Sequence, residues 1–400
     1  MTSTLDQITL LLMLSVLIAM VARRLKLPYT VGLMAAGIGL TALGLNPEVR
    51  LTRELLFSVF LPPLIFESAY HIKWSELAAR LTPVLTMATV GVGIAASLVA
   101  VGMHYLVGWG WGASWLFAVL IAATDPVSVI ATFKDARVTG EPRLMVEAES
   151  LFNDATAAVA YAIVIAAVSG KSVSIGANLM SFGVSVGGGL AIGGLVGALT
   201  LFLAGRQDEK LLDITLTMVA AYASFWIAER FHVSGVLATL TAGLMVGNLG
   251  ELGHLSDSSR EAVVSFWEVA TFMVNSLVFL LIGFSVLHQR LPGIAQAIGV
   301  AILLVLIGRA AAVYGCCAVF RTPKSKVSFP LQHVLFWGGL RGALGLALAL
   351  GIPNQLPYAT TVRAVTFFVV AFSIIVQGLT MTPLLKKLGF VAEPEKAAHG

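Results

Sequence analysis

Charged residues are scarce in this sequence. Asp, Glu, Lys and Arg make up 12% of its 400 residues, whereas hydrophobic types make up 58%. A soluble globular domain carries about 25% charged residues. Apolar runs long enough to span a bilayer recur between Leu10 and Leu385. The composition therefore excludes an ordinary soluble domain and predicts a membrane protein that crosses the bilayer several times as helices.

Cysteine is almost absent as well. The two cysteines, Cys316 and Cys317, are neighbours in an apolar run. Neighbours on a helix point in different directions, so we expect two small buried residues rather than a disulfide or a metal pair. The sequence also lacks a nucleotide-binding loop, a zinc-ligand spacing and a nucleophile elbow. We therefore expect no cofactor, no enzymatic activity and, with a net charge of only +4, no nucleic-acid partner.

Thirteen apolar segments are predicted to cross the membrane as α-helices. They cover 7–22, 29–45, 52–70, 81–107, 113–134, 142–169, 179–204, 211–229, 232–249, 264–287, 293–320, 331–351 and 358–385. The first six and the last six form two halves of opposite orientation, and in each half the fifth segment has a polar, breakable centre. Interrupted helices at corresponding positions indicate the binding site of a transporter. The expected fold is an all-α polytopic membrane protein with two inverted six-helix repeats and interrupted crossing helices.

The distribution of basic residues predicts the orientation of the chain. Arg23, Arg24 and Lys26 follow the first segment, and Lys386 and Lys387 follow the last. Lys and Arg concentrate in cytoplasmic loops. We therefore expect the N-terminus outside the cell, the C-terminus in the cytoplasm, and the chain in the inner or plasma membrane.

The stretch from Ile121 to Ala155 places four polar or ionisable residues in two neighbouring predicted spans. It contains Asp125, Glu149, Asn153 and Asp154. A carboxylate at the centre of a bilayer costs at least about 2.5–3.5 kcal/mol. Such groups in two neighbouring spans indicate an ion or proton path. The alternative is a pair of helices whose acids have only a structural role.

A proline inside the fifth segment predicts a break in that helix. Pro126 lacks an N–H group, and it biases Asp125 away from the helical conformation. An open backbone at this depth is tolerated only where it lines a cavity or is buried in protein. The Thr124 hydroxyl, the Asp125 carboxylate and a freed carbonyl are the hard oxygen donors that alkali cations need. A simple proline kink without any ligand is the alternative.

The sixth segment supplies further polar groups at helical spacing. Ser150 and Asp154 are four residues apart and share one helix face, whereas Glu149 and Asn153 share the adjacent face. This pattern predicts one titratable carboxylate, Asp154, with neutral polar helpers. Glu149 needs a counter-charge, and Arg309 is the candidate because arginine stays charged and forks onto a carboxylate.

Two more charged residues lie inside predicted spans. Arg341, in the glycine-rich stretch GGLRGALGLAL, would bring a positive charge to the second break, where it could offset Asp125 and the C-terminal ends of helices. The alternative for Arg341 is a side chain that reaches the membrane surface. Glu67 follows Pro62 and Pro63, and it lies either at the cytoplasmic mouth of the site or in contact with interfacial water.

Five motifs in order along the chain carry a resemblance to a known family. These are TDPVSV, ESLFNDA, SGVLATLTAGLMVGN, a mid-span GR and FWGGLRGAL. The chain resembles the monovalent cation/proton antiporter family, in its sodium/proton exchanger branch that includes the NhaP-type antiporters. The resemblance implies Na⁺, or also Li⁺ or K⁺, and H⁺ as substrates, a homodimer in membrane lipid, a role in pH and sodium homeostasis, and a core domain that slides against a dimerisation domain in elevator fashion.

The resemblance also implies roles for individual residues. Asp154 would carry the cation or the proton, with Asp125, Thr124 and Ser150 lining the cation site and Glu67 near it.

Three further roles follow from the same motifs. Asn153 would belong to the site and, by matching the Asn-Asp form of ESLFNDA, implies electroneutral exchange, while Glu149 and Arg309 would form a structural ion pair. The expected organisation is a single transmembrane domain over 1–390, with a core at about 81–169 and 293–385, a scaffold at about 7–70 and 179–287, and a short cytoplasmic tail at 391–400.

Two other functions fit part of the pattern. Asp125 and Asp154 in adjacent spans could share a proton as an intramembrane aspartyl protease does, although neither has a Gly-x-Gly-Asp context. An uncoupled cation channel would use the same polar residues without moving protons. Peptide cleavage and proton-coupled flux separate these functions from exchange.

Overall fold

The computed structural model describes residues 4–25, 27–45, 49, 51–136, 138–170, 175–204, 209–249, 256–286, 293–320 and 326–391, and these residues form helices and connecting segments without a strand. The helices are α1 (Thr4–Arg24), α2 (Tyr29–Ala42), α3 (Arg53–Leu55), η1 (Leu56–Phe60), α4 (Leu61–His71), α5 (Trp74–Thr86), η2 (Met87–Gly91), α6 (Val92–Val107), α7 (Trp111–Ala122), α8 (Val127–Asp135), α9 (Glu141–Val168), α10 (Ile175–Leu203), α11 (Lys210–Arg230), α12 (Gly235–Leu249), α13 (Asp257–Val286), α14 (Ala295–Val319), α15 (Phe329–Trp337), α16 (Ala343–Leu350), α17 (Ala359–Phe372), η4 (Ser373–Gln377) and α18 (Gly378–Lys387). The segments η1, η2 and η4 are π-helical turns that continue into the next α-helix.

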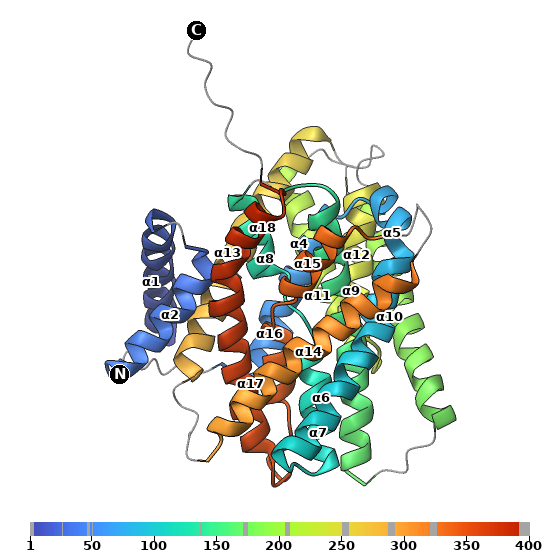
Figure 1. The fold of residues 1–400 in the computed structure, drawn as a ribbon. Helices are drawn as coiled ribbons and strands as arrows, with labels where there is room; N and C mark the ends of the chain where they lie inside the picture. The colour runs from blue at the N-terminus through green and yellow to red at the C-terminus, as the bar shows by residue number, and fades with distance from the viewer. Residues whose placement is uncertain are drawn as a thin grey trace.

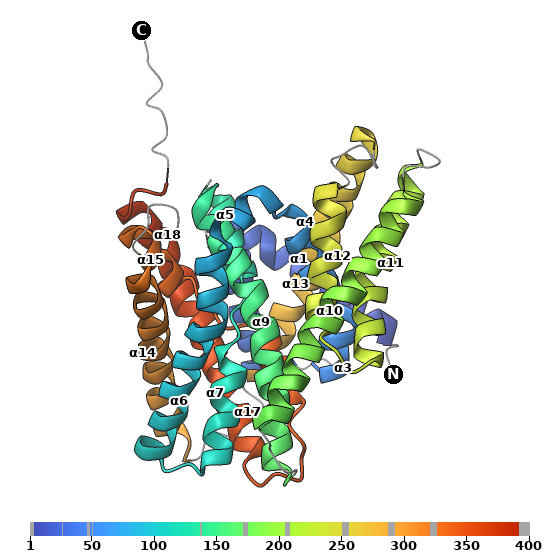
Figure 2. The same cartoon turned by 90° about the vertical axis from the view of Figure 1, so that its right-hand side faces the viewer.

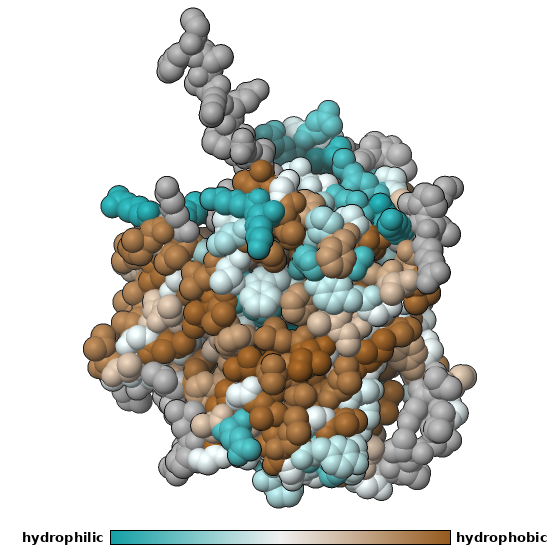
Figure 3. Space-filling view, in the orientation of Figure 1, coloured by the Kyte–Doolittle hydropathy of each residue, from teal (hydrophilic) through white to brown (hydrophobic). Residues whose placement is uncertain are grey.

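The helices have the length and composition of membrane spans. Eight helices within the described ranges are long and apolar enough to cross a bilayer, and α2, α7 and α12 are shorter apolar helices. Hydrophobic residues cover the middle of the face in Figure 3, and hydrophilic side chains gather along its top. The prediction of a multi-pass, all-helical membrane protein is confirmed.

Each predicted segment falls on a helix, on helices that follow one another directly, or on two short helices separated by a break. Two beginnings were placed too late. The helix predicted from 81 begins at Trp74, and the helix predicted from 264 begins at Asp257. Their first turns carry charged residues such as Glu76 and Arg260 and therefore lie outside the apolar run that marks a span. The apolar pattern thus predicts a later start for both helices. The exact number of crossings and the inverted repeat stay predictions.

The helices pack into two groups. In one group α2 lies along α13, α4 lies along α12, and α10 and α11 also pack against α12; in the other, α6 packs against α14 and α7, and α7 packs against α9. Figure 2 shows α6, α7 and α14 on one side of the molecule and α11, α12 and α13 on the other. Contacts of α9 with α4 and α12, and of α2 with α8, join the two groups.

Two helices are broken near the middle of the molecule. Residues 123–126 separate α7 from α8, and residues 338–342 separate α15 from α16 (Figure 1). The two breaks contact each other, because the backbone N–H of Asp125 donates to the Leu340 carbonyl at 2.7 Å. The breaks therefore bring two distant parts of the chain to one place.

Cys316 and Cys317 are both free and buried, in agreement with the prediction. Lys26 and tail residues 392–400, on which the orientation and the cytoplasmic tail partly depend, lie outside the described residues.

Candidate functional site

Thr124, in the first break, is held by two residues of α9. Its backbone N–H donates to Asn153 Oδ1 at 3.1 Å, and Asn153 Nδ2 donates back to Thr124 Oγ1 at 2.6 Å. The Thr124 and Ser150 hydroxyls lie 2.9 Å apart. All three residues are buried. These contacts fix the open backbone to α9 and satisfy polar groups that the helix break leaves without intrahelical partners.

Arg341, in the second break, lies at the end of the first broken helix. Its Nη1 donates to the carbonyl of Ala122 at 2.7 Å and contacts that of Ala123 at 3.3 Å. These carbonyls belong to the C-terminal end of α7, where the helix dipole is negative. Arg341 is 3% exposed, so its guanidinium is inside the protein and does not reach the membrane surface. The backbone N–H of Arg341 donates to the hydroxyl of Ser373 at 2.9 Å.

Glycine is required where the two breaks meet. A Cβ atom on Gly342 would collide with the side chain of Asp125, and one on Gly339 would collide with the guanidinium of Arg309. Two charged side chains therefore lie directly against the backbone of the second break. The glycine-rich sequence around Arg341 is what allows this close approach.

Glu149 and Arg309 form a buried ion pair. Arg309 Nη1 donates to Glu149 Oε1 at 2.7 Å, and Nη2 donates to Oε2 at 2.8 Å and to the Leu335 carbonyl at 2.8 Å. Asn153 Nδ2 adds a hydrogen bond to Glu149 Oε1 at 3.1 Å. The carboxylate thus has a two-point contact with a guanidinium, the geometry of a strong charged pair. The pair joins α9 to α14 and to the last turn of α15.

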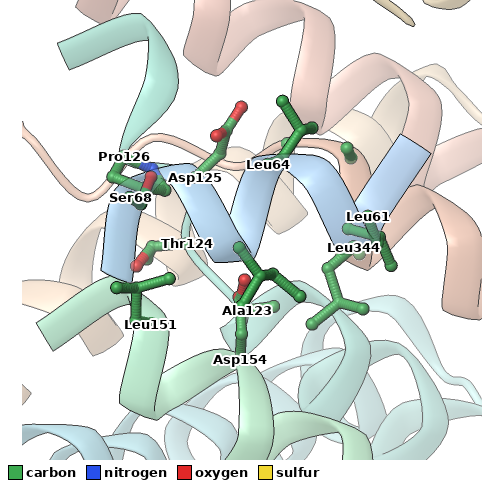
Figure 4. A pocket seen from close by; sticks show the side chains of 14 residues that line it. Leu61, Leu64, Ser68, Ala123, Thr124, Asp125, Pro126, Leu151, Asp154 and Leu344 are labelled. Carbon is green, nitrogen blue, oxygen red and sulfur yellow. The ribbon is translucent and has the colours of Figure 1, made fainter. Parts of the chain in front are cut away.

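Asp154 lines a small cavity between the two breaks. The cavity has a volume of about 30 Å³, which is room for one or two water-sized species. Figure 4 shows Asp154 on α9, Thr124 and Asp125 in the first break, and Leu61 and Leu64 on α4 around this cavity. Asp154 is 8% exposed, and its Oδ1 is buried without a hydrogen-bond partner among the described residues. A buried carboxylate beside a cavity of this size can bind a cation or a proton.

The polar helpers predicted for Asp154 have other partners. Ser150 pairs with Thr124, and the Asn153 amide is divided between Thr124 and Glu149. Neither forms a hydrogen bond with Asp154 in the described part of the chain. Helical spacing correctly places Ser150 and Asp154 on one helix. The hydrogen-bond partners of Ser150 and Asn153 depend instead on the first break, which lies against α9.

Glu67 does not line the small cavity. It lines a second, wider cavity of about 420 Å³ that shares Leu64 and Ser68 with the small one. The Oε1 atom of Glu67 lies 3.6 Å from Nδ1 of His71. Glu67 thus lies directly before Ser68 and one helical turn after Leu64, and both of these residues line the Asp154 cavity.

The wider cavity contains charged residues that sequence reasoning missed. Glu147, Glu268, Lys134 and Arg23 line it together with Glu67. Lys134 on α8 lies 3.3 Å from Glu268 on α13, and Arg143 lies 3.4 Å from Glu147. Glu147 is two residues before Glu149, and its near-complete burial could have been suspected from the apolar residues around it. These groups form a polar approach to the Asp154 cavity.

The side-chain donors around the small cavity are oxygen atoms. Within the described ranges, no group of three or more His, Cys, Asp or Glu residues is arranged to hold a metal. The small cavity instead offers two carboxylates and the Thr124 hydroxyl. Few charges with neutral oxygen donors suit an ion that must bind and then leave.

These features define a class of protein. A multi-pass helical membrane protein with two broken helices that meet beside buried carboxylates has the architecture of a secondary transporter. The family model described as "Sodium/hydrogen exchanger, transmembrane" matches residues 10–387. The chain belongs to this sodium/hydrogen exchanger family.

Relatives and solved structures agree with the family. The chain is 37% identical to the Na(+)/H(+) antiporter ApNhaP of Aphanothece halophytica, over 92% of this chain and 71% of that protein. It is 32% identical to the Na(+)/H(+) antiporter NhaP of Pseudomonas aeruginosa, over 99% of both. The sodium proton antiporter MjNhaP1 from Methanocaldococcus jannaschii has the same fold, with a TM-score of 0.78 at 21% identity over 97% of this chain and 98% of that one.

Proposed function

We propose that this protein exchanges a monovalent cation for a proton across the cell membrane. Na⁺ is the expected cation, with Li⁺ and K⁺ as further substrates, and the cell would use the exchange for pH and sodium homeostasis. The observation that carries the proposal is the position of Asp154, which lines a cavity of about 30 Å³ and has one carboxylate oxygen without a hydrogen-bond partner among the described residues. Relatives of this chain that have a similar length are named Na(+)/H(+) antiporters.

Asp154 would take either ion at the same oxygen atoms. Thr124 and Asp125 line the same cavity and would complete the cation's oxygen shell. Ser150 and Asn153 support this shell by holding Thr124 in place. A cation and a proton cannot occupy one carboxylate oxygen together, so binding of one displaces the other. Glu67, in the adjoining cavity, would attract cations toward the site.

Glu149 and Arg309 would have a structural role. Their charges neutralise each other through two short hydrogen bonds, so neither is available to a transported ion. Arg341, with its guanidinium on the end of α7, would provide a fixed positive charge beside Asp125. Asn153 cannot ionise. One carboxylate, Asp154, is then left to exchange its ion, which favours electroneutral exchange of one cation for one proton.

An elevator motion would carry the site across the membrane. Helices from the proposed core, 81–169 and 293–385, and from the proposed scaffold, 7–70 and 179–287, pack mainly within their own group. The two groups meet along α9 and α4, which both line the Asp154 cavity. The proposed assembly is a homodimer in membrane lipid, with the N-terminus outside and the C-terminus in the cytoplasm.

The cavity size weighs against the two alternatives. A peptide substrate does not fit a space of about 30 Å³ between Asp125 and Asp154, which argues against an aspartyl protease. An uncoupled channel needs a wide continuous path, whereas Asp154 is 8% exposed and lines a cavity of only about 30 Å³ between α4, α9 and both breaks.

Proteoliposomes that contain a pH-sensitive dye test the proposed function. Addition of Na⁺, Li⁺ or K⁺ to one side should move protons in the opposite direction, and each cation is measured separately. Cation flux without proton movement would identify a channel, and peptide cleavage by the purified protein would identify a protease. Either result would overturn the proposal.

A further inference from the structure

A large apolar groove lies between the two helix groups. Its volume is about 660 Å³, within the range of ligand sites. One wall is formed by α5 and η2 and the other by α10 and α12, and α9 forms the floor. In Figure 2, α5 and α9 lie beside α10 and α12 on the face toward the viewer.

The groove has no polar group to offer a ligand along most of its length. Its three threonines, Thr89, Thr156 and Thr241, each donate their hydroxyl hydrogen to a carbonyl of their own helix four residues earlier. Their hydroxyl hydrogens are therefore not available to a ligand in the groove. The remaining lining consists of aliphatic and aromatic side chains, except at one end. An apolar hollow of this kind stays free of water, so only hydrocarbon suits it.

The polar end of the groove is already satisfied within the protein. Asn248 accepts a hydrogen bond from the backbone N–H of Trp74 at 2.6 Å, and its amide donates to the carbonyls of Ile72 and Leu244, both at 2.8 Å. The Trp74 side chain is 53% exposed, as is typical of tryptophans at the membrane surface. Lys73, next to it, has a 65% exposed side chain whose Nζ lies 3.9 Å from Oε1 of Glu76, and the ammonium group has three donors, so it can also reach a phosphate. This end thus combines an interfacial aromatic ring with an accessible positive charge.

The length of the groove matches one leaflet of a bilayer. Fifteen residues separate Trp74 at the polar end from Thr89 at the apolar end, which corresponds to about 22 Å of helix. Half of a bilayer, with its headgroup region, measures about 20–22 Å. A phospholipid with its phosphate near Lys73 would therefore place its acyl chain along the full groove.

We infer that this groove binds one acyl chain of a membrane phospholipid, with the phosphate of the lipid at Lys73. The bound chain lies against Phe152, Ala155 and Thr156 of α9. At 100° per residue, Phe152 and Thr156 are on the opposite face of α9 from Asp154, and Ala155 is on its side. The lipid thus packs behind the helix that carries the proposed ion-binding carboxylate and fills the space between the two helix groups. The binding site itself does not depend on the proposed exchange.

Photolabelling tests the site in the full-length protein. The probe is a phosphatidylglycerol with a diazirine at the end of one acyl chain, added to purified protein in nanodiscs, and crosslinks are mapped by mass spectrometry. Leu190→Trp fills the groove, and Val186→Phe does so with a smaller change. Leu195→Trp is the matched control, because Leu195 is on the same helix, is 71% exposed and does not line the groove.

The expected result is saturable labelling of groove residues, which unlabelled phosphatidylglycerol competes away. The variants L190W and V186F should lower this labelling at least fivefold, and L195W should leave it unchanged. Uniform labelling of the whole apolar surface, or groove labelling that neither filling variant reduces, would overturn the inference.

The thermal midpoint of delipidated protein tests the headgroup. Dioleoylphosphatidylglycerol should raise this midpoint in the wild type and in L195W but not in L190W. Lys73→Ala should shift the half-maximal lipid concentration upward, whereas Lys386→Ala, at an exposed lysine of α18, should not. Equal shifts for both lysine variants would contradict the placement of the phosphate at Lys73.

Discussion

Asn153 Nδ2 lies 2.6 Å from Thr124 Oγ1 and 3.1 Å from Glu149 Oε1. One amide group therefore joins the first helix break to the buried ion pair. Its own carbonyl oxygen accepts the Thr124 backbone N–H at 3.1 Å. Asn153, directly before the proposed ion-binding residue Asp154, therefore holds the site together without carrying a charge.

Asn153→Asp should lower the stability of the protein. The substitution removes both amide donors and places a second carboxylate beside Glu149, and a lost buried hydrogen bond costs about 1–3 kcal/mol. Thermal unfolding in detergent at pH 8 measures the effect. Asn354→Asp, at an exposed position, is the control. An unchanged melting temperature for N153D would mean that these hydrogen bonds do not hold the site.

Asp154→Asn should abolish exchange while the protein still folds. The amide matches the carboxylate in size, but it cannot bind a proton and binds a cation weakly. Proton movement on cation addition is measured in proteoliposomes, with the melting temperature as a check of folding. Asp257→Asn, at the exposed start of α13, should exchange normally. Residual exchange by D154N above that of empty vesicles would remove Asp154 from its proposed role.

Glu149→Gln and Arg309→Met should each destabilise the protein by about 3–5 kcal/mol, because each leaves one buried charge without its partner. The double variant should recover part of this loss. The exposed pair Lys73–Glu76, with 3.9 Å between Nζ and Oε1, is the control, since exposed pairs contribute at most about 1 kcal/mol. Losses that simply add in the E149Q/R309M protein would show that the two charges do not act as a pair.

The apparent KM for the cation should rise as the pH falls. A proton on Asp154 blocks the cation, so the two ions compete, whereas the maximum rate at saturating cation should change less. Initial rates over a series of cation concentrations at several pH values, equal on both sides of the membrane, test this. A constant KM with a falling maximum rate would indicate that protons act at a separate site.

Much of the fold followed from the sequence because the bilayer limits the possible structures. Apolar runs became helices, and Pro126 and the glycines around Arg341 coincide with the two breaks. A buried carboxylate needs a counter-charge, and this requirement predicted Arg309 as the partner of Glu149. Each of these expectations depends on a local rule or on a strong energetic cost.

Other features depend on how distant helices approach each other. Helical spacing could not tell that Ser150 would bond to Thr124 instead of Asp154, because that contact requires the first break to lie against α9. The pairing of Lys134 with Glu268 joins residues from α8 and α13, and each looks in sequence like an ordinary charge at a span end. The early start of α5 was hidden for a similar reason, since its charged first turns do not belong to an apolar run.

One carboxylate, Asp154, would exchange one cation for one proton. The mobile part of the protein would then have the same net charge in both crossings, and the membrane potential would not affect the cycle. Movement of one net charge would instead couple the cycle to the potential by about 2.3 kcal/mol per 100 mV.

The most direct measurement imposes a potassium diffusion potential with valinomycin on proteoliposomes, with Na⁺ or Li⁺ as the test cation and a fixed pH gradient. If Asp154 alone exchanges its ion, the initial exchange rate will be the same at positive, zero and negative potential. A rate that changes with the sign of the potential, or a sustained current on a supported membrane, would contradict the one-carboxylate account.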